Sequence, residues 1–533
     1  MMGWDAETDF IVVGAGAAGC VVASRLSESG RHQVTLIEAG PTDWHPYVHI
    51  PATFLYLQHD TRFTWGYKVD PQPGLGGRAP ILRQGKLLGG SSSINGQIFL
   101  RGQRAEYADW VAQGCTGWSY EEVLPFFKKM ESYDGGADDW RGDSGPITVS
   151  RARQTHPLSR AFVDAAAELG YPRNPDFNGA QREGAGFVQG SRNGRFRAGP
   201  AQTYLRQAKR RANLRIETEA LTERVIFEGK RAIGVEITQR GQRRRIRARC
   251  EIIISCGALK SPHLLHLSGI GPAAQLRAQG VPVIHDLPGV GANLRDHYSI
   301  RINQRTHGVT TLNQTSRGWR VGIEALKYVF AARGLLAYAT TTSGLFCRSN
   351  PDLAAPDLYL SFMPGSYADA GVLEREGGMA IGVVVSHPAS RGHVRLVSPD
   401  PLVQPSIDPA YLSAESDRTA MLAGIRLARR LYATQAFAPY AVGETRPGLS
   451  VENDSDLLDF MHARATPWLH FAGSCRMGVD SMAAVTPDLT VHGIEGLRVM
   501  DASIMPGVSS GNTQAPTIMI GEKGADMVLR SWQ

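Results

Sequence analysis

Two sets of residues at opposite ends of this 533-residue chain have the side-chain types that oxidation of an alcohol requires. His470 stands in LHFAGSCRMG, and Asn512 stands in SSGNTQAPTIMIGEKGAD. A neutral imidazole can accept a hydroxyl proton near neutral pH, and a neutral amide can bind the same oxygen and orient the adjacent C–H bond. Near the N-terminus, VVGAGAAGC has the glycine spacing of a dinucleotide site. Together these residues predict removal of hydride from an alcohol.

The N-terminal motif is Gly14-x-Gly16-x-x-Gly19. The first glycine permits a tight turn, the second allows the backbone to approach a pyrophosphate, and the third allows close packing of helix on strand. The following helix N-terminus offers free N–H groups to the phosphates. Glu38 ends the next predicted strand and is placed to accept hydrogen bonds from the ribose hydroxyls. The motif by itself does not distinguish NAD from FAD.

Hydrophobic periodicity predicts the elements that must position these residues. A β-branched run, a helical stretch and a second short strand form a βαβ start at 9–13, 17–26 and 33–37. The aromatic-rich segment 44–67 has no clear period, and we interpret it as a long loop over the cofactor. Further strands are predicted at 252–254, 358–362, 381–385 and 497–500, a strand–turn–strand at 214–237, and helices at 120–131, 418–432, from Ser261 and from Pro516.

Three further segments of the sequence distinguish between NAD and FAD as the cofactor. They are GGSSSING at 89–96, GALKSP at 257–262 continuing to SGIG at 268–271, and LPGVGANL at 287–294. In these segments, and in order along essentially the whole chain, the sequence resembles the glucose–methanol–choline (GMC) oxidoreductase family. The resemblance implies bound FAD and an α/β FAD-binding (Rossmann-like) domain with an inserted α+β substrate domain on an antiparallel sheet. We place the FAD-binding parts at 1–155, 196–296 and 465–533, the last also catalytic, and the substrate parts at 156–195 and 297–464.

The resemblance also implies roles for individual residues. His470 and Asn512 fall on the two catalytic positions, and the helix at Pro516 would point its N-terminus at the flavin. Ile94 stands where some members carry the histidine that bonds FAD covalently, so we expect noncovalent FAD. Leu469, among bulky apolar neighbours, is expected to contact the substrate. The remaining cofactor contacts are expected along the pyrophosphate and flavin ring from Gly90, Asn95 and Gly96, at the adenine from the backbone of Thr222, and beside the phosphates and ribityl chain from Asp501 and Ala502.

These residues predict an FAD-dependent oxidoreductase that converts a primary alcohol, with an apolar or aromatic body favoured, to the aldehyde. A choline-like or polyol substrate remains open, although no carboxylate can be assigned to a quaternary ammonium group. Relatives that hold FAD for lyase or light-driven decarboxylase chemistry leave a non-redox function open as well. The electron acceptor is oxygen or another compound.

The formal charge of +7 comes largely from two basic runs, 209–215 and 240–249. We interpret them as solvated surface and expect no nucleic-acid partner, because no nucleic-acid module accompanies them. A nucleic-acid-associated flavoprotein is the weaker alternative. The six cysteines lack metal or disulfide spacing, so we expect a reducing compartment and no metal site. No signal peptide or membrane-spanning run is recognisable, and the expected location is cytoplasmic.

Overall fold

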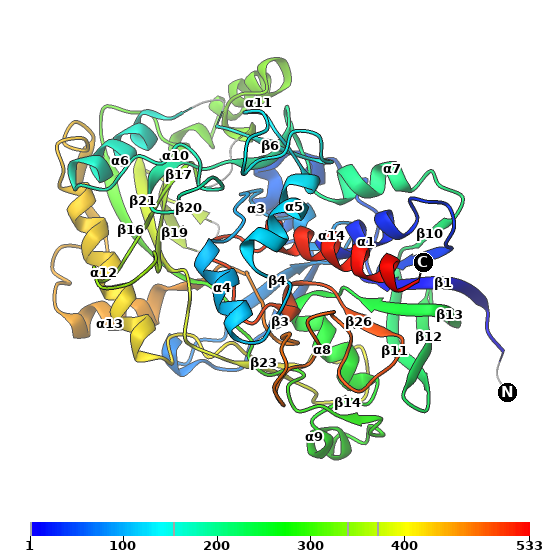
Figure 1. The fold of residues 1–533 in the computed structure, drawn as a ribbon. Coiled ribbons are helices and arrows are strands. Elements are labelled where there is room, and N and C mark those ends of the chain that lie inside the picture. Colours follow the sequence, from blue (N-terminus) through cyan, green and yellow to red (C-terminus); the bar gives the residue numbers. More distant parts are fainter. Residues whose placement is uncertain (1–2, 153–154, 338–340, 370–371, 533) are drawn as a thin grey trace.

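The computed structural model describes residues 3–152, 155–337, 341–369 and 372–532 (Figure 1). The chain builds two large sheets. In Figure 1 the parallel-stranded sheet, with both termini, lies to the right and an antiparallel sheet lies to the left. This mixed α/β architecture with an antiparallel sheet agrees with the fold class expected from the sequence. The division into domains with the boundaries given above stays a prediction.

The first sheet carries the glycine motif at the carboxyl end of its central strand. β1 lies between β2 and β13 in parallel register, and β10 and β26 extend the parallel part. The β11–β12 hairpin joins β13 in antiparallel register. The core of β1 is fully buried, which suits its run of β-branched and aromatic residues. In spatial order the strands are β10 (Leu214–Glu217), β2 (Val34–Ile37), β1 (Ala6–Val13), β13 (Gln242–Ile254), β12 (Arg231–Gln239) and β11 (Ala220–Glu228), with β26 (Leu497–Val499) beside β13.

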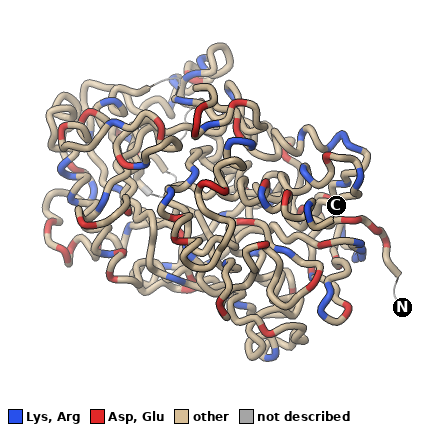
Figure 2. Tube along the Cα trace, in the orientation of Figure 1, with Lys and Arg blue, Asp and Glu red and all other residues tan. Residues whose placement is uncertain are grey.

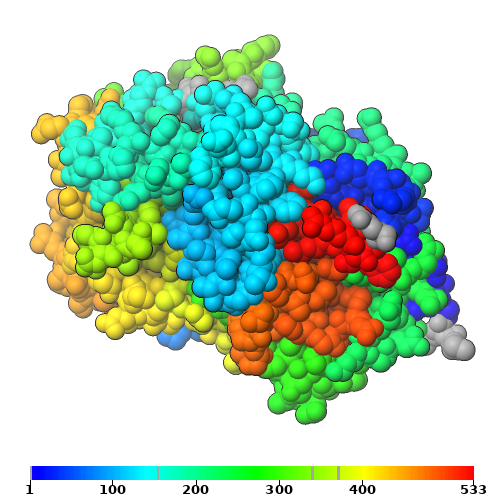
Figure 3. All heavy atoms as spheres, viewed as in Figure 1, coloured from blue at the N-terminus to red at the C-terminus, as the bar shows by residue number. Residues whose placement is uncertain are grey.

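Helices from the two ends of the chain pack side by side on this sheet. α1 (Ala17–Leu26) and α14 (Gln514–Ser531) are neighbours, and the blue and red segments adjoin on the surface in Figure 3. A Cβ at Gly521 would lie 3.0 Å from the carbonyl oxygen of Ala18, so the axes approach closely because glycine is present. Across the same contact, Arg25 forms an ion pair with the fully buried carboxylate of Glu522 at 2.8 Å. This contact carries the segment with Asn512 back to the glycine motif.

The second sheet is antiparallel throughout and has two distinct faces. Ile300, Ile302, Ile381 and Val383 lie in the hydrophobic core with the helices α6 and α12. Side chains alternate along a strand, so the residues between them lie on the opposite face. The strand order is β24 (Ala441–Arg446), β16 (Tyr298–Thr306), β21 (Gly378–Val385), β18 (Leu358–Met363), β17 (Ser343–Cys347) and β7 (Gly184–Phe187), with β25 (Thr466–Pro467) beside β16.

Smaller elements connect the two sheets. The minor strands pair as β3 (Thr64–Lys68) with β4 (Ile81–Gly85), β14 (Ile270–Gly271) with β15 (His285–Asp286), β19 (Tyr367–Asp369) with β20 (Val372–Leu373), β22 (His393–Arg395) with β23 (Ser406–Asp408), and β5 (Glu131–Tyr133), β6 (Ile147–Ser150), β8 (Gly190–Asn193), β9 (Phe196–Arg197) in one sheet. The other α-helices are α2 (Pro46–His49), α3 (Phe54–Leu57), α4 (Arg104–Ala112), α5 (Tyr120–Met130), α6 (Pro157–Glu168), α7 (Arg206–Ala208), α8 (Gly257–Leu267), α9 (Ala273–Ala278), α10 (Leu312–Thr315), α11 (Arg320–Ala331), α12 (Glu415–Tyr432) and α13 (Asp454–Arg464). Short 3-10 or π turns lie at Pro51–Thr53, Pro73–Leu75, Gly90–Ser93, Ala201–Leu205, Leu335–Ala337 and Ala502–Ile504.

Three expectations about elements were wrong. The segment 44–67 is not one long loop, because it contains α2, α3 and the start of β3. Its helices are four residues long, too short to show a helical period. α8 begins at Gly257 rather than at Ser261, and α14 begins at Gln514, so that Pro516 is its third residue. Both Gly257 and Pro516 lie in the first turn, where missing hydrogen bonds are tolerated.

Most of the second basic run, 240–249, lies on strand β13. Its arginines form ion pairs with carboxylates of neighbouring strands, among them Arg245 with Glu236 at 3.0 Å and Arg249 with Asp9 at 2.7 Å. Figure 2 shows Lys and Arg interspersed with Asp and Glu over the chain trace. Within the described ranges no helix has the length and hydropathy to cross a bilayer.

We predict that Glu522→Ala lowers the free energy of unfolding by about 3 kcal/mol, because it leaves Arg25 and the hydroxyl of Tyr204 without their buried acceptor. Glu28→Ala is the matched control, since Glu28 also pairs with Arg25 but has a side chain that is 54% exposed. We expect it to change stability by less than about 0.5 kcal/mol. Urea unfolding of both variants measures the difference. Equal losses would contradict a dominant role for the α1–α14 contact.

Candidate active site

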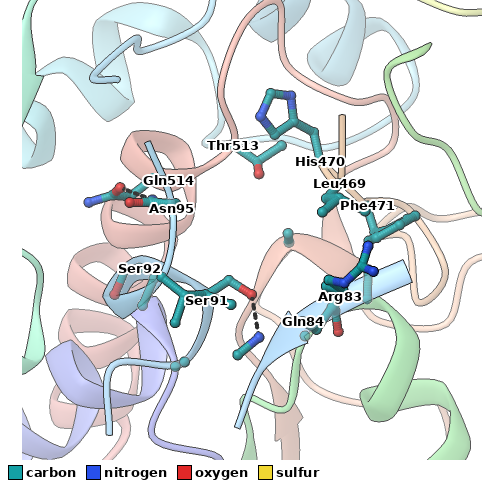
Figure 4. A pocket seen from close by; sticks show the side chains of 18 of the residues that line it. Arg83, Gln84, Ser91, Ser92, Asn95, Leu469, His470, Phe471, Thr513 and Gln514 are labelled. Atoms are coloured by element: carbon teal, nitrogen blue, oxygen red, sulfur yellow. Dashed lines mark hydrogen bonds between the residues drawn. The ribbon is translucent and has the colours of Figure 1, made fainter. Parts of the chain in front are cut away.

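A cavity of about 400 Å³ lies between the two sheets and receives residues from both ends of the chain (Figure 4). In Figure 4, His470 and Thr513 lie along one wall, and Gln84 and Ser91 lie along another. The predicted site residues that line the cavity are Gly14, Gly16, Glu38, Gly90, Asn95, Gly96, Thr222, Leu469, His470, Asp501, Ala502 and Asn512. Gly19 does not line it and lies within α1. The structure thus brings the predicted residues together, while their individual roles stay predictions.

The glycine motif forms one end of the cavity. Gly14 has φ +94°, and a Cβ there would lie 2.6 Å from the carbonyl oxygen of Ser255. A Cβ on Gly19 would lie 1.9 Å from the carbonyl oxygen of Gly14, so only glycine lets the helix pack on the turn. The nearest neighbour of a Cβ on Gly16 would be 3.6 Å away, which leaves this position free to approach a ligand. Gly90 also packs tightly, with a Cβ 2.9 Å from the Cα of Gly16.

Glu38 lies at the same end, with a side chain that is almost fully buried. One carboxylate oxygen accepts a hydrogen bond from the N–H of Ala15, and the other accepts from the N–H of Gly40, both at 2.9 Å. Burial raises the pKa of Glu38 to about 7. The carboxylate therefore holds the glycine turn to the end of β2, in addition to the ribose contact predicted for it. Nearby, the buried hydroxyl of Thr222 has no hydrogen-bond partner within the described ranges.

Asp501 is committed to protein donors. Its carboxylate accepts hydrogen bonds from the N–H of Gly257 at 2.9 Å, the hydroxyl of Ser261 at 2.5 Å and the N–H of Ser503 at 2.7 Å. These bonds fix the first turn of α8 beside Ala502. Also along the cavity, the Asn95 amide donates to the side chain of Gln514 in the first turn of α14 (Figure 4). The N-terminus of α14 therefore faces the cavity, and its orientation toward the flavin stays a prediction.

His470 is the centre of a hydrogen-bond chain. Its Nε2 lies 3.0 Å from Nδ2 of Asn512, and its Nδ1 lies 2.9 Å from Nδ1 of His297. Nε2 of His297 lies 2.9 Å from the carbonyl oxygen of Ser386. A carbonyl can only accept, so Nε2 of His297 carries the proton and its Nδ1 is the acceptor. His470 must then donate from Nδ1, and its Nε2 keeps an unprotonated lone pair.

Both imidazoles are neutral at neutral pH. Burial, and to a smaller extent the neighbouring His297, lowers the pKa of His470 well below its usual value. Burial likewise lowers the pKa of His297 to about 4. The lone pair on Nε2 of His470 is therefore available as a proton acceptor over the neutral and mildly acidic range.

The backbone of His470 is held by a buried carboxylate. Asp296 accepts hydrogen bonds from the N–H of His470 and from the hydroxyl of Tyr411, both at 2.6 Å. Burial raises the pKa of Asp296 to about 7. Leu469 has φ +65°, which is unusual for a branched side chain and turns the chain sharply just before the histidine.

The roles of Asp296 and His297 were not predicted from the sequence, although both lie within three residues of the end of the LPGVGANL segment. The feature of the sequence that could have indicated them is an aspartate followed by a histidine immediately before the residues that form β16. It has no meaning until the fold places His297 against His470.

Comparisons with known proteins agree with this architecture. The family model described as GMC oxidoreductase matches residues 8–299 through its N-terminal part and 388–521 through its C-terminal part. Mitochondrial choline dehydrogenase of Mus musculus is 40% identical over 98% of this chain and 89% of its own length. Oxygen-dependent choline dehydrogenase of Brucella anthropi is 39% identical over 98% of this chain and 96% of its own length.

Solved structures give the same result. Pyridoxine 4-oxidase from Mesorbium loti superposes with a TM-score of 0.89, at 30% identity over 97% of this chain and 98% of that one. A fungal aryl-alcohol oxidase superposes with a TM-score of 0.86, at 26% identity over 98% and 99% of the two chains.

The cavity fits the FAD that members of this family bind. The glycine turn leaves a cradle that a Cβ would fill, the N-terminus of α1 opens beside it, and the orphaned hydroxyl of Thr222 marks a polar position without a protein partner. Ile94 lines the same cavity and has no nucleophilic atom, so noncovalent binding stays our prediction.

We predict that Gly19→Ala reduces FAD content at least tenfold, because the new Cβ must displace the carbonyl of Gly14 and with it the turn. Gly443→Ala is the control, since a Cβ at Gly443 meets nothing within 4 Å. The ratio of flavin to protein absorbance after gel filtration measures both variants. Full FAD occupancy in Gly19→Ala would contradict the assignment of the cradle.

Proposed function

We propose that this chain, which belongs to the GMC oxidoreductase family, oxidises an alcohol with His470 as the general base and Asn512 as the orienting group. The enzyme is an FAD-dependent oxidoreductase that acts on CH–OH groups. The observation that supports the assignment of the base is the chain from Ser386 through His297 to His470, which leaves the lone pair of Nε2 unprotonated. Donation by Asn512 to this nitrogen is consistent with the same tautomer.

FAD, when bound, supplies the acceptor for the hydride. The chain's own residues control the proton. A hydroxyl placed between Nε2 of His470 and the amide of Asn512 gives its proton to Nε2, while the amide donates to the oxygen as negative charge develops on it. Proton transfer to a positioned base contributes about 10²- to 10⁴-fold to a rate.

The neighbours of His470 support a substrate with an apolar or aromatic body. Trp468 packs edge-on against both His470 and Tyr359, with ring centroids 5.5 and 5.7 Å apart. Trp468 lies with an apolar cluster around Phe346 and Val384, whereas Phe471 and Leu469 pack with a different cluster around Leu82. Phe471 is buried there, so the apolar wall that faces the substrate comes mainly from Trp468 rather than from all of its bulky neighbours.

A choline-like substrate is the second candidate, because relatives at about 40% identity are named choline dehydrogenases. Trp468 could face a trimethylammonium group through its ring. Against this candidate, the acidic residues along the cavity are Glu38 and Asp501, both at the nucleotide end and both bonded to protein donors.

The proposal is tested by mixing the yellow holoenzyme anaerobically with aliphatic, aromatic and amino alcohols and recording the flavin spectrum. Bleaching by one class supports alcohol oxidation and defines the substrate. Return of colour on exposure to air separates oxygen from another acceptor. A spectrum that no alcohol changes would favour the non-redox alternatives, including a lyase.

We predict that His470→Ala keeps FAD bound and slows flavin reduction by at least 10²-fold, since the hydroxyl loses its proton acceptor. His492→Ala is the control, because His492 is bonded to the backbone carbonyl of Gly478 and does not line the cavity. Stopped-flow flavin reduction with a saturating alcohol measures both. A near-normal rate in His470→Ala would remove it as the base.

We predict that His297→Phe lowers the reduction rate by 10- to 100-fold without loss of FAD, because Nδ1 of His470 loses the acceptor that fixes its tautomer. The pH profile separates this positioning role from a structural one. The rate requires neutral His470, so activity falls on the acid side, and removal of His297 moves that fall to higher pH by removing one cause of the lowered pKa. An amide in His297→Asn should restore part of the rate. An unchanged pH profile in His297→Phe would contradict the role.

A further inference from the structure

Arg301 is a basic residue in the wall of the cavity. It lies on β16 and lines the cavity on the face of the antiparallel sheet opposite the hydrophobic core. Its Nη1 donates a hydrogen bond to the hydroxyl of Thr466 at 3.3 Å, and its guanidinium stacks on the ring of Tyr367 at 5.0 Å. Among the side chains that the structure describes, no carboxylate forms an ion pair with it. Burial lowers the pKa of Arg301, so its charge is held at an electrostatic cost.

The residues beside Arg301 leave room for a ligand. Gly382 lies directly opposite Arg301 on β21, and Ser361 lies opposite Gly382 on β18. All three line the cavity, together with Ala380. A glycine and two small side chains next to a long arginine keep the sheet surface open in front of the guanidinium.

The charged residues that line the cavity are of both signs, and the two acidic ones lie at the nucleotide end. Apart from Arg301, the basic residues that line the cavity are Arg83 and Lys260. The acidic lining residues are Glu38 and Asp501. Glu38 and Asp501 are already bonded to protein donors. The substrate end of the cavity therefore favours an anion, and it disfavours a cation such as a quaternary ammonium group.

We propose that Arg301 binds a carboxylate of the substrate, so that the enzyme oxidises a hydroxy acid rather than a neutral or cationic alcohol. This inference rests on the proposed function. The planar guanidinium can donate two parallel hydrogen bonds to a carboxylate, and the stacked Tyr367 holds that plane in one orientation.

The spacing of His297 and Arg301 along the chain limits the length of a substrate that contacts both His470 and Arg301. Arg301 is four residues beyond His297, which places their backbones about 13 Å apart in an extended strand. His297 contacts His470 directly. Because the arginine side chain reaches back over part of this distance, a hydroxyl at His470 and a carboxylate at Arg301 would be joined by a short chain or one ring.

The test compares the holoenzyme with Arg301→Gln, using 4-hydroxybutyrate, 1,4-butanediol and choline as probes in anaerobic flavin reduction. We expect 4-hydroxybutyrate to give the highest second-order rate constant in the unaltered enzyme. Arg301→Gln should lower that value at least tenfold and leave the value for 1,4-butanediol within a factor of three. Arg301→Lys, which keeps the charge, should lose less.

Arg305→Gln is the matched control, because Arg305 lies on the same strand but is already paired with Glu374 and Glu376. We expect no selective loss with 4-hydroxybutyrate in this variant. A second readout avoids turnover: butyrate should perturb the flavin spectrum of the unaltered holoenzyme at saturable concentration, and this perturbation should disappear in Arg301→Gln.

The outcomes distinguish the two proposals. Reduction by 1,4-butanediol or choline with equal or greater efficiency than by 4-hydroxybutyrate, unchanged by Arg301→Gln, would overturn the carboxylate assignment and leave alcohol oxidation standing. Saturable butyrate binding that depends on Arg301, without reduction by any alcohol, would support the carboxylate site and overturn the proposed reaction. Equal effects of Arg301→Gln and Arg305→Gln would overturn a specific role for Arg301.

Discussion

The packing of α14 against α1 is the constraint on which the site depends. Asn512 and the glycine motif are about 500 residues apart in sequence, and they share one cavity because the C-terminal helix lies against the first helix. The close approach at Gly521 and the ion pair between Arg25 and Glu522 hold this contact. The same helix presents its N-terminus to the cavity through Gln514, so one packing contact places both the orienting amide and a partial positive charge.

A second constraint is the direction of one hydrogen-bond chain. Three neutral groups in a row, the two imidazoles and the Asn512 amide, could adopt several proton arrangements. The carbonyl of Ser386 removes this freedom, because it can only accept. The tautomer of His470 is therefore decided by a backbone carbonyl at the end of a strand of the second sheet. His470 itself lies on the segment along which the chain passes from β25 of the second sheet to β26 of the first. The chemistry depends on how the two sheets meet, and not only on the histidine itself.

Features that depend on neighbouring residues in the sequence could be predicted. Features that depend on contacts between distant residues could not. The glycines, Glu38 and the first βαβ unit follow from turn geometry and hydrophobic pattern, and the family resemblance identified His470 and Asn512. Nothing local distinguishes His297 or Arg301 from an ordinary residue at the start or middle of a buried strand, because their roles come from cross-strand neighbours and from His470. The short helices in 44–67 escaped detection for a different reason, since four residues are too few for periodicity to register.

The two walls of the cavity have different roles in the proposed function. In the proposed function, the wall formed by His470, Asn512 and the glycine motif determines which bond is broken, and its chemistry is the same for any alcohol. In the proposal for Arg301, the antiparallel sheet determines which alcohol is held, since Arg301, Gly382 and Ser361 lie in one row across it. Similarity to choline dehydrogenases over the full chain therefore bears most strongly on the reaction. In our proposal, a charged Arg301 disfavours a trimethylammonium group beside it, because desolvation strengthens the repulsion between like charges. The reaction type and the charge of the substrate are separable properties of this fold.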